Sequence, residues 1–138
     1  DEGMKMLAGK RIVAVLLPGA AFSLMFGRYA EARKMIEFNV PVALGTDFNP
    51  NCWIENLQTI IALACHQMKL TPAEAIVATT INAAHAINRA KEVGSLEVGK
   101  KADILVLDIP NHRFLGYRYG VNLIDKVLKN GKVVVEIS

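Results

Sequence analysis

The sequence is poor in cysteine. Its two cysteines, Cys52 and Cys65, form no Cys-x-x-Cys pair and are too few for a disulfide framework, so they suit a reducing compartment. The N-terminus also lacks the charged segment followed by an apolar stretch that marks a secretory signal. We therefore expect a cytoplasmic protein.

Long apolar runs and clusters of like charge are missing as well. No stretch approaches the roughly 20 apolar residues that span a membrane. Lysine and arginine are scattered along the chain, and the formal net charge is only +3. A nucleic-acid-binding surface needs a concentrated basic patch. We therefore expect neither a membrane nor a nucleic acid as a partner.

Short apolar strands and helices alternate in the first part of the chain. Residues 12–17 form a continuous apolar run, which is typical of a strand buried on both faces. Residues 30–38 have the composition of a helix, and residues 41–45 form a second apolar strand. Strand, helix, strand is the pattern of a parallel α/β layer or barrel.

Two further helices and a β-rich tail follow. Residues 53–68 repeat apolar side chains at helical spacing, and Thr71, Pro72 and Glu74 together predict a capped helix start. A short helix is expected over residues 81–87. Beyond residue 90 the chain turns to short β-favouring runs, and Asn130-Gly131 predicts a hairpin between the last two. These runs cover residues 104–107, 121–124, 126–128 and 132–136.

The segment 45–51 carries the most distinctive polar residues. Asp47 follows the second apolar strand at once, with Asn49 and Asn51 close behind. In parallel α/β folds, catalytic groups gather at the carboxyl ends of the strands. An aspartate there can bind a metal or exchange a proton with a metal-bound water. Asp47 and Asn49 are equally compatible with capping the following helix, because Asp and Asn favour caps and turns.

Several segments of the chain carry a family resemblance. Residues 40–50 and the upstream residues 13–22 are similar to the last barrel strand, and to the strand before it, of the imidazolonepropionase family in the amidohydrolase superfamily. Residues 94–104 are similar to the return into the small β domain throughout the superfamily. Asp47-Phe48-Asn49-Pro50 and Gly120-Val121-Asn122-Leu123 point to the imidazolonepropionases in particular. The resemblance runs over essentially the whole chain.

The resemblance implies an α/β fold. Residues 1–90 would hold the last two strands and helices of a TIM-like (β/α)8 metal-dependent hydrolase barrel, and residues 91–138 the C-terminal strands of a small β-sandwich domain. A complete barrel takes about 250 residues. The chain also starts at Asp1 without an initiator methionine. We therefore expect the C-terminal portion of a longer enzyme.

The resemblance also implies roles for four residues. Asp47 matches an aspartate that binds metal and shuttles protons. Asn49 matches a residue at the carboxylate-bearing end of the substrate, and Asn51 and Cys52 match two further substrate contacts. Bacterial members often have Gly and then Ser or Thr at the last two positions. A backbone contact is compatible with Asn51, whereas Cys52 has no hydroxyl group.

The implied reaction is hydrolysis of the ring amide of 4-imidazolone-5-propanoate to N-formimidoyl-L-glutamate in histidine degradation. The implied cofactor is zinc or iron, which lowers the pKa of bound water. Asp47 would take a proton from that water and deliver it to the leaving ring nitrogen. The partner is then a small-molecule substrate, and a homodimer is compatible with the resemblance, since such enzymes are often symmetric dimers.

Arg28 follows a loop expected over residues 18–27. In a barrel this loop lies on the active-site face, so Arg28 could meet an anionic substrate, although a solvated arginine is the commoner case.

The histidines do not follow the pattern of a metal site. The family's other ligands are histidines, including a His-x-His pair, whereas His66, His85 and His112 stand apart. The first two lie in expected helices and the third in an expected turn. We therefore predict that the isolated chain is inactive and binds metal poorly.

Two other functions stay open at this point. A different metal-dependent amidohydrolase, such as a deaminase or a cyclic amidase, could share the position of Asp47, although residues 47–50 argue against it. A non-catalytic domain could bind a partner through the β-rich tail. It would need to fold alone, and two apolar strands require neighbours to cover them.

Overall fold

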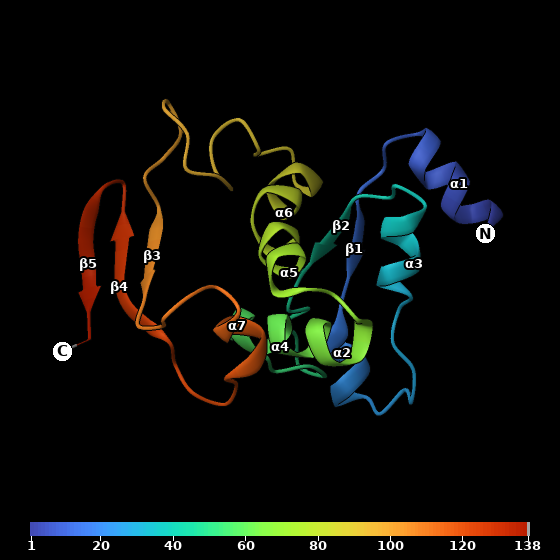
Figure 1. Ribbon diagram of the computed structural model, residues 1–138, viewed down its shortest axis with the longest axis horizontal. Helices are drawn as coiled ribbons and strands as arrows, with labels where there is room; N and C mark the ends of the chain where they lie inside the picture. Colours follow the sequence, from blue (N-terminus) through green and yellow to red (C-terminus); the bar gives the residue numbers. More distant parts are fainter. Residues whose placement is uncertain (138) are drawn as a thin grey trace.

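Two separate sheets organise the chain, of which the computed structural model describes residues 1–137. A parallel pair joins β1 (Ala14–Leu16) to β2 (Val42–Leu44). An antiparallel sheet has the order β3 (Ile104–Leu107), β4 (Ile124–Lys129) and β5 (Lys132–Glu136). The antiparallel sheet lies at one end of the molecule, beside the C-terminal end, and the N-terminal helix lies at the other (Figure 1).

Seven helices accompany the strands within residues 1–137. They are α1 (Glu2–Gly9), α2 (Pro18–Ser23), α3 (Ala32–Glu37), α4 (Leu57–Met68), α5 (Pro72–Thr79), α6 (Ile81–Ala86) and α7 (Phe114–Tyr117). None of them combines the length and the apolar character that a membrane span requires. Helices α5 and α6 pack against the parallel strands, and α4 contacts α2, α5 and α7 (Figure 1).

The parallel pair confirms the strand–helix–strand prediction. Ala14 lies opposite Val42 and Leu16 opposite Leu44, and α3 lies on the connection between the two strands. All three residues of β2 are buried, as predicted. The prediction that β1 is buried on both faces is wrong at Val15, which is 51% exposed. Val15 is therefore only partly covered within residues 1–137.

One core joins the parallel strands, the central helices and the tail. Ile60 and Ala64 of α4 are fully buried, and they cluster with Leu44 of β2. Leu115 and Leu123, from the segment after residue 90, belong to the same cluster. The tail therefore contributes to the core that supports the strand ends.

Local signals predicted the helix start and the hairpin correctly. Thr71 and Glu74 form both hydrogen bonds of a capping box at α5. Asn130 and Gly131 connect β4 to β5 with positive φ values of 50° and 77°, as a type I′ turn requires. Other predictions were wrong: α2 occupies the expected loop after β1, residues 53–56 precede α4 instead of belonging to it, and residues 121–123 are not a strand.

Candidate functional site

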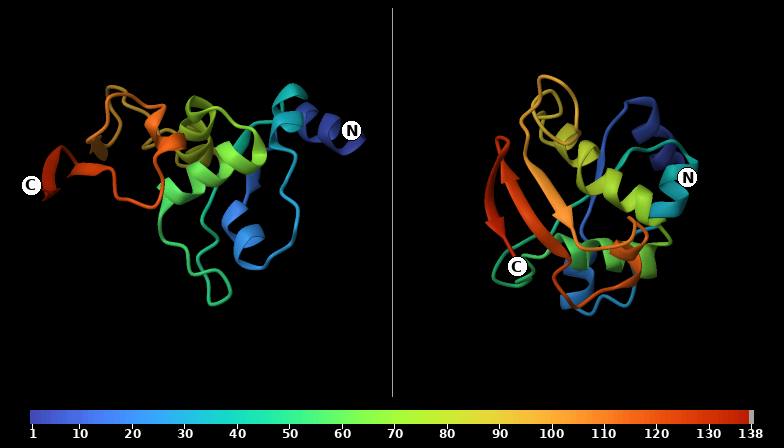
Figure 2. Two further views of the ribbon diagram at one scale, coloured as in Figure 1. Left: turned by 60° about the horizontal axis from the view of Figure 1, so that its bottom comes forward. Right: turned by 60° about the vertical axis from the view of Figure 1, so that its left-hand side comes forward.

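The segment between β2 and α4 holds all four predicted site residues. It projects from the body on the same side as the segment that follows β1, as the left view of Figure 2 shows. Asp47 lies three residues beyond the end of β2 and is exposed. Its φ of 55° is left-handed, a conformation that Asp tolerates better than most residues. The aspartate thus sits at the carboxyl end of the parallel strands.

Asn49 holds this segment in shape. Its Nδ2 donates a hydrogen bond to the Asp47 carbonyl at 2.6 Å, and its Oδ1 accepts one from the Asn51 N–H at 2.9 Å. Its backbone pairs in both directions with Cys52. Asn49 therefore fixes the backbone on either side of itself.

Capping does not explain these residues. The N-cap of α4 is Asn56, whose Oδ1 accepts hydrogen bonds from the N–H groups of Gln58 and Thr59. The interpretation of Asp47 and Asn49 as caps of α4 is therefore wrong. The Asp47 carboxylate has no structural task of that kind.

Cys52 anchors the segment to the rest of the molecule. Its side chain is 1% exposed. Its Sγ lies 3.6 Å from the Thr46 carbonyl oxygen and 3.7 Å from Ser23 Oγ, at the end of α2. Asn51, in contrast, is exposed at the tip of the segment. The four predicted residues are thus close in the chain but differ in exposure.

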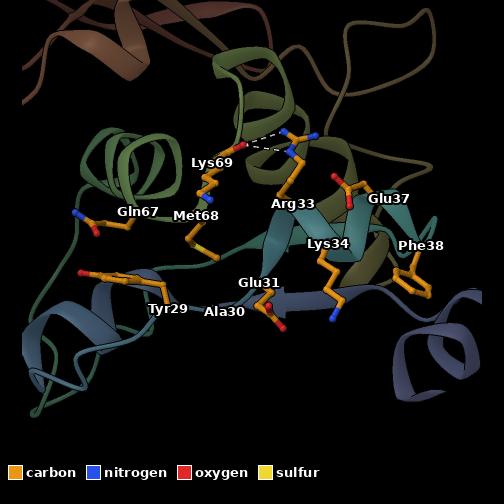
Figure 3. Close-up of a pocket in the computed structure, with 10 residues that line it drawn as sticks. All are labelled: Tyr29, Ala30, Glu31, Arg33, Lys34, Glu37, Phe38, Gln67, Met68 and Lys69. Carbon is orange, nitrogen blue, oxygen red and sulfur yellow. Dashed lines mark hydrogen bonds between the residues drawn. The ribbon is translucent and has the colours of Figure 1, made fainter. Parts of the chain in front are cut away.

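A pocket of about 800 Å³ opens beside Asp47. Its walls are mainly apolar side chains of α2 and the following segment, together with Arg28, Tyr29 and Glu31. An apolar pocket with a few polar groups is a typical small-molecule site. A second pocket of about 420 Å³ shares Tyr29, Ala30, Glu31 and Met68 with it (Figure 3). Residues 29–31 therefore form a wall between the two.

An ion pair fixes the helix that follows this wall. Arg33 of α3 donates hydrogen bonds to both carboxylate oxygens of Glu74. Its Nη2 also donates one to the Lys69 carbonyl oxygen at 2.9 Å (Figure 3). The Arg33 hydrogen bonds lower the pKa of Glu74 from 4.5 to about 2, and the Thr71 hydrogen bonds act in the same direction. The pair ties α3 to the start of α5.

The described residues do not form a complete metal site. Across residues 1–137, no group of three or more His, Cys, Asp or Glu side chains could hold a metal ion. His66 and His85 lie exposed on α4 and α6, and His112 lies in a turn, as expected. Asp47 is therefore not part of a complete ligand set within these residues.

An exposed acid at the carboxyl ends of parallel strands, beside an apolar pocket, is a typical site of an α/β hydrolase. The sequence agrees: the chain belongs to the amidohydrolase family, whose profile matches residues 27–134.

The more particular resemblance is to imidazolonepropionases. The chain is 55% identical to the imidazolonepropionase of Alkaliphilus oremlandii (strain OhILAs) over 137 residues, which are 99% of this chain and 32% of that protein. It is 53% identical to the imidazolonepropionase of Treponema denticola over 137 residues, which are 99% of this chain and 33% of that protein. The chain thus spans about a third of the length of these relatives.

Solved structures share the fold. A mutant of atrazine chlorohydrolase from Arthrobacter aurescens TC1, complexed with zinc and atraton, superposes with a TM-score of 0.84 at 22% identity, covering 98% of this chain and 34% of that one. An adenosine deaminase from Xanthomonas campestris with bound zinc gives a TM-score of 0.80 at 22% identity, covering 96% and 34%. The α/β amidohydrolase fold is confirmed.

Proposed function

We propose that this chain is the part of an imidazolonepropionase that carries the active-site aspartate, in an enzyme that hydrolyses the ring amide of 4-imidazolone-5-propanoate to N-formimidoyl-L-glutamate. The observation that supports this function is the sequence identity of 50–55% with imidazolonepropionases over nearly the whole chain. Eight solved structures of this fold, whose names give other substrates or none, are 18–23% identical to the chain. This contrast favours the imidazolone over a deaminase substrate, and it favours an enzyme over a non-catalytic domain.

In this proposal Asp47 moves a proton. Its exposed carboxylate accepts a proton from the attacking water and passes it to the ring nitrogen as the amide bond breaks. No capping bond to α4 occupies it, because Asn56 caps that helix. The left-handed backbone at Asp47, which Asn49 braces, sets the direction of the side chain.

Asn49, Asn51 and Cys52 bind the substrate in this proposal. Asn49 keeps one N–H of Nδ2 and one lone pair of Oδ1 beyond its bonds within the segment, so it can brace the loop and contact a ligand together. Asn51 is exposed at the tip and offers its side-chain amide. Cys52 contacts substrate only when its thiol turns away from Thr46 and Ser23.

A divalent metal is part of the proposed function, as zinc or iron. Asp47 supplies one carboxylate ligand, which suits either ion. A complete ligand set needs side chains from outside residues 1–137, because no three metal-binding side chains gather within them. Zinc is named for two solved amidohydrolases with this fold.

We also propose the finer architecture. Residues 1–90 belong to a TIM-like barrel as its last two strands and helices, and residues 91–138 to a small β-sandwich domain. Support comes from β1 and β2, which within residues 1–137 pair only with each other, and from the exposed Val15. Unpaired parallel strands need neighbours on their outer edges. A cytoplasmic location and a homodimer complete the proposal.

A chimera tests the function. This chain replaces the matched third of the Alkaliphilus oremlandii imidazolonepropionase, and hydrolysis of 4-imidazolone-5-propanoate is measured against a panel of deaminase substrates. We expect activity on the imidazolone alone. Asp47→Asn should lower kcat about a thousandfold, whereas Glu55→Gln, which removes an exposed charge from the same segment, should not. A chimera that prefers another substrate would disprove the proposal.

A further inference from the structure

Arg28 lines the same pocket as Asp47. It lies between α2 and α3, in the segment that follows the carboxyl end of β1, and it is exposed. Within residues 1–137 its guanidinium forms neither an ion pair nor a side-chain hydrogen bond with the protein, Glu31 included. Its five N–H donors are therefore available to a ligand.

Among the described residues, Arg28 is also the one basic side chain that lines this pocket. The other charged side chains there, Glu31 and Asp47, are acids. The basic residues Arg33, Lys34 and Lys69 line the neighbouring pocket, beyond the wall of residues 29–31 (Figure 3). Two of these are engaged elsewhere: Arg33 with Glu74, and Lys34 with Asp1.

The rest of the pocket wall is mostly apolar. It includes Leu17, Pro18, Ala20, Ala21, Leu24, Phe26 and Met68. An ionised ligand group in such surroundings loses water contacts and needs a charged partner to replace them. A guanidinium fits a carboxylate in particular, because its planar fork donates two parallel hydrogen bonds.

We infer that Arg28 determines substrate specificity by binding the carboxylate of the substrate while Asp47 acts at the ring. The inference rests on the proposed function. Because Arg28 touches an end of the substrate that does not react, its contact is the same in the ground state and in the transition state. Such a contact governs KM and leaves kcat unchanged.

The experiment uses the chimera and two substrates, the imidazolone with its propanoate side chain and the same imidazolone with an uncharged propanamide. Arg28→Gln should raise KM for the propanoate about tenfold or more, the usual effect of losing a charge-assisted hydrogen bond. KM for the propanamide and kcat for both substrates should stay unchanged. For Arg28→Lys, KM for the propanoate should lie between the values of the unaltered chimera and of Arg28→Gln. Lysine keeps the positive charge but lacks the planar fork of donors.

Arg11→Gln is the matched control. Arg11 is exposed and precedes β1, at the opposite end of the strand from the pocket. Its loss changes the net charge equally and should alter neither KM. If Arg28→Gln leaves the ratio of the two KM values as in the unaltered chimera, the inference is overturned and the proposed function stands. If the unaltered chimera hydrolyses neither imidazolone, the proposed function fails, and the inference falls with it.

Discussion

The two terminal nitrogens of Arg33 bind the two carboxylate oxygens of Glu74, across 41 residues of sequence. Glu74 at the same time accepts hydrogen bonds from the N–H and the hydroxyl of Thr71, as the third residue of the α5 capping box. One carboxylate thus starts a helix and holds a second helix against it. The segment that carries Arg28 into the pocket ends where α3 begins.

This ion pair predicts a loss of stability in acid. The folded-state pKa of Glu74 is about 2, against 4.5 for an unpaired glutamate, so its contribution to the free energy of unfolding is present above pH 4.5 and is lost as the pH falls toward 2. Since the two side chains are 34% and 30% exposed, we expect about 1 kcal/mol. Urea unfolding of the 138-residue chain at several pH values measures it.

Glu74→Gln should remove that part of the acid dependence, while a glutamine still serves the capping box. Glu55→Gln should leave the dependence unchanged, because Glu55 is exposed and forms no ion pair within the described residues. Equal acid dependence in the Glu74 variant and the unaltered chain would show that the pair contributes nothing.

Asn49→Ala should loosen the segment that carries Asp47. The substitution removes the side-chain bonds to the Asp47 carbonyl and to the Asn51 N–H, each worth about 1 kcal/mol. We expect faster hydrogen exchange at the Asn51 amide with the helices unaffected. Asn51→Ala is the control, since no side-chain hydrogen bond of Asn51 exists within residues 1–137. An unchanged exchange rate in Asn49→Ala would mean that the backbone bridge between Asn49 and Cys52 alone keeps the segment ordered.

Gly116→Ala should destabilise the contact between α7 and α4. An added Cβ would lie 2.9 Å from Cys65 Sγ and 3.0 Å from Pro72 Cγ, so α7 would have to shift. Overpacking of this kind costs about 1–3 kcal/mol, which thermal unfolding detects. Cys65→Ala in the same chain should restore part of the loss. Gly9→Ala, where nothing lies within 4 Å, should cost nothing. A neutral Gly116→Ala would contradict the close packing.

The isolated chain should bind zinc or iron weakly and lack hydrolase activity. Asp47 is a single ligand, and no cluster of three metal-binding side chains lies within residues 1–137. Metal analysis after dialysis should find well below one ion per chain, and the chimera should recover both metal and activity. One tightly bound ion per isolated chain, or hydrolysis by it, would refute this expectation.

The sequence predicted what local interactions determine. The capping box of Thr71 and Glu74 and the turn at Asn130-Gly131 depend on residues within a few positions of each other, and both predictions were confirmed. Asp47 was placed correctly at a strand end because the apolar run before it is short and clear. Its alternative role as a cap could be rejected only when the structure showed Asn56 in that position.

The sequence could predict neither the long-range contacts nor which strand faces are covered by other elements. Nothing in the sequence around Arg33 indicates that its partner lies 41 residues away. The exposure of Val15 depends on which elements surround β1, and that is not a property of the strand itself. Pro18 suggested the end of a strand, yet proline is also favoured in the first turn of a helix, and the structure begins α2 there. The proline signal alone does not separate the two cases.

The buried thiol of Cys52 gives this site an internal reporter. It is 1% exposed and lies between Thr46 and Ser23, so a thiol reagent reaches it only when the segment 45–52 swings away from α2. The rate at which the Cys52 thiol is alkylated therefore measures how often the segment 45–52 opens. Cys65 lies half-buried on α4, and burial raises the pKa of its thiol. Its separate alkylation rate reports on the helices and not on the loop.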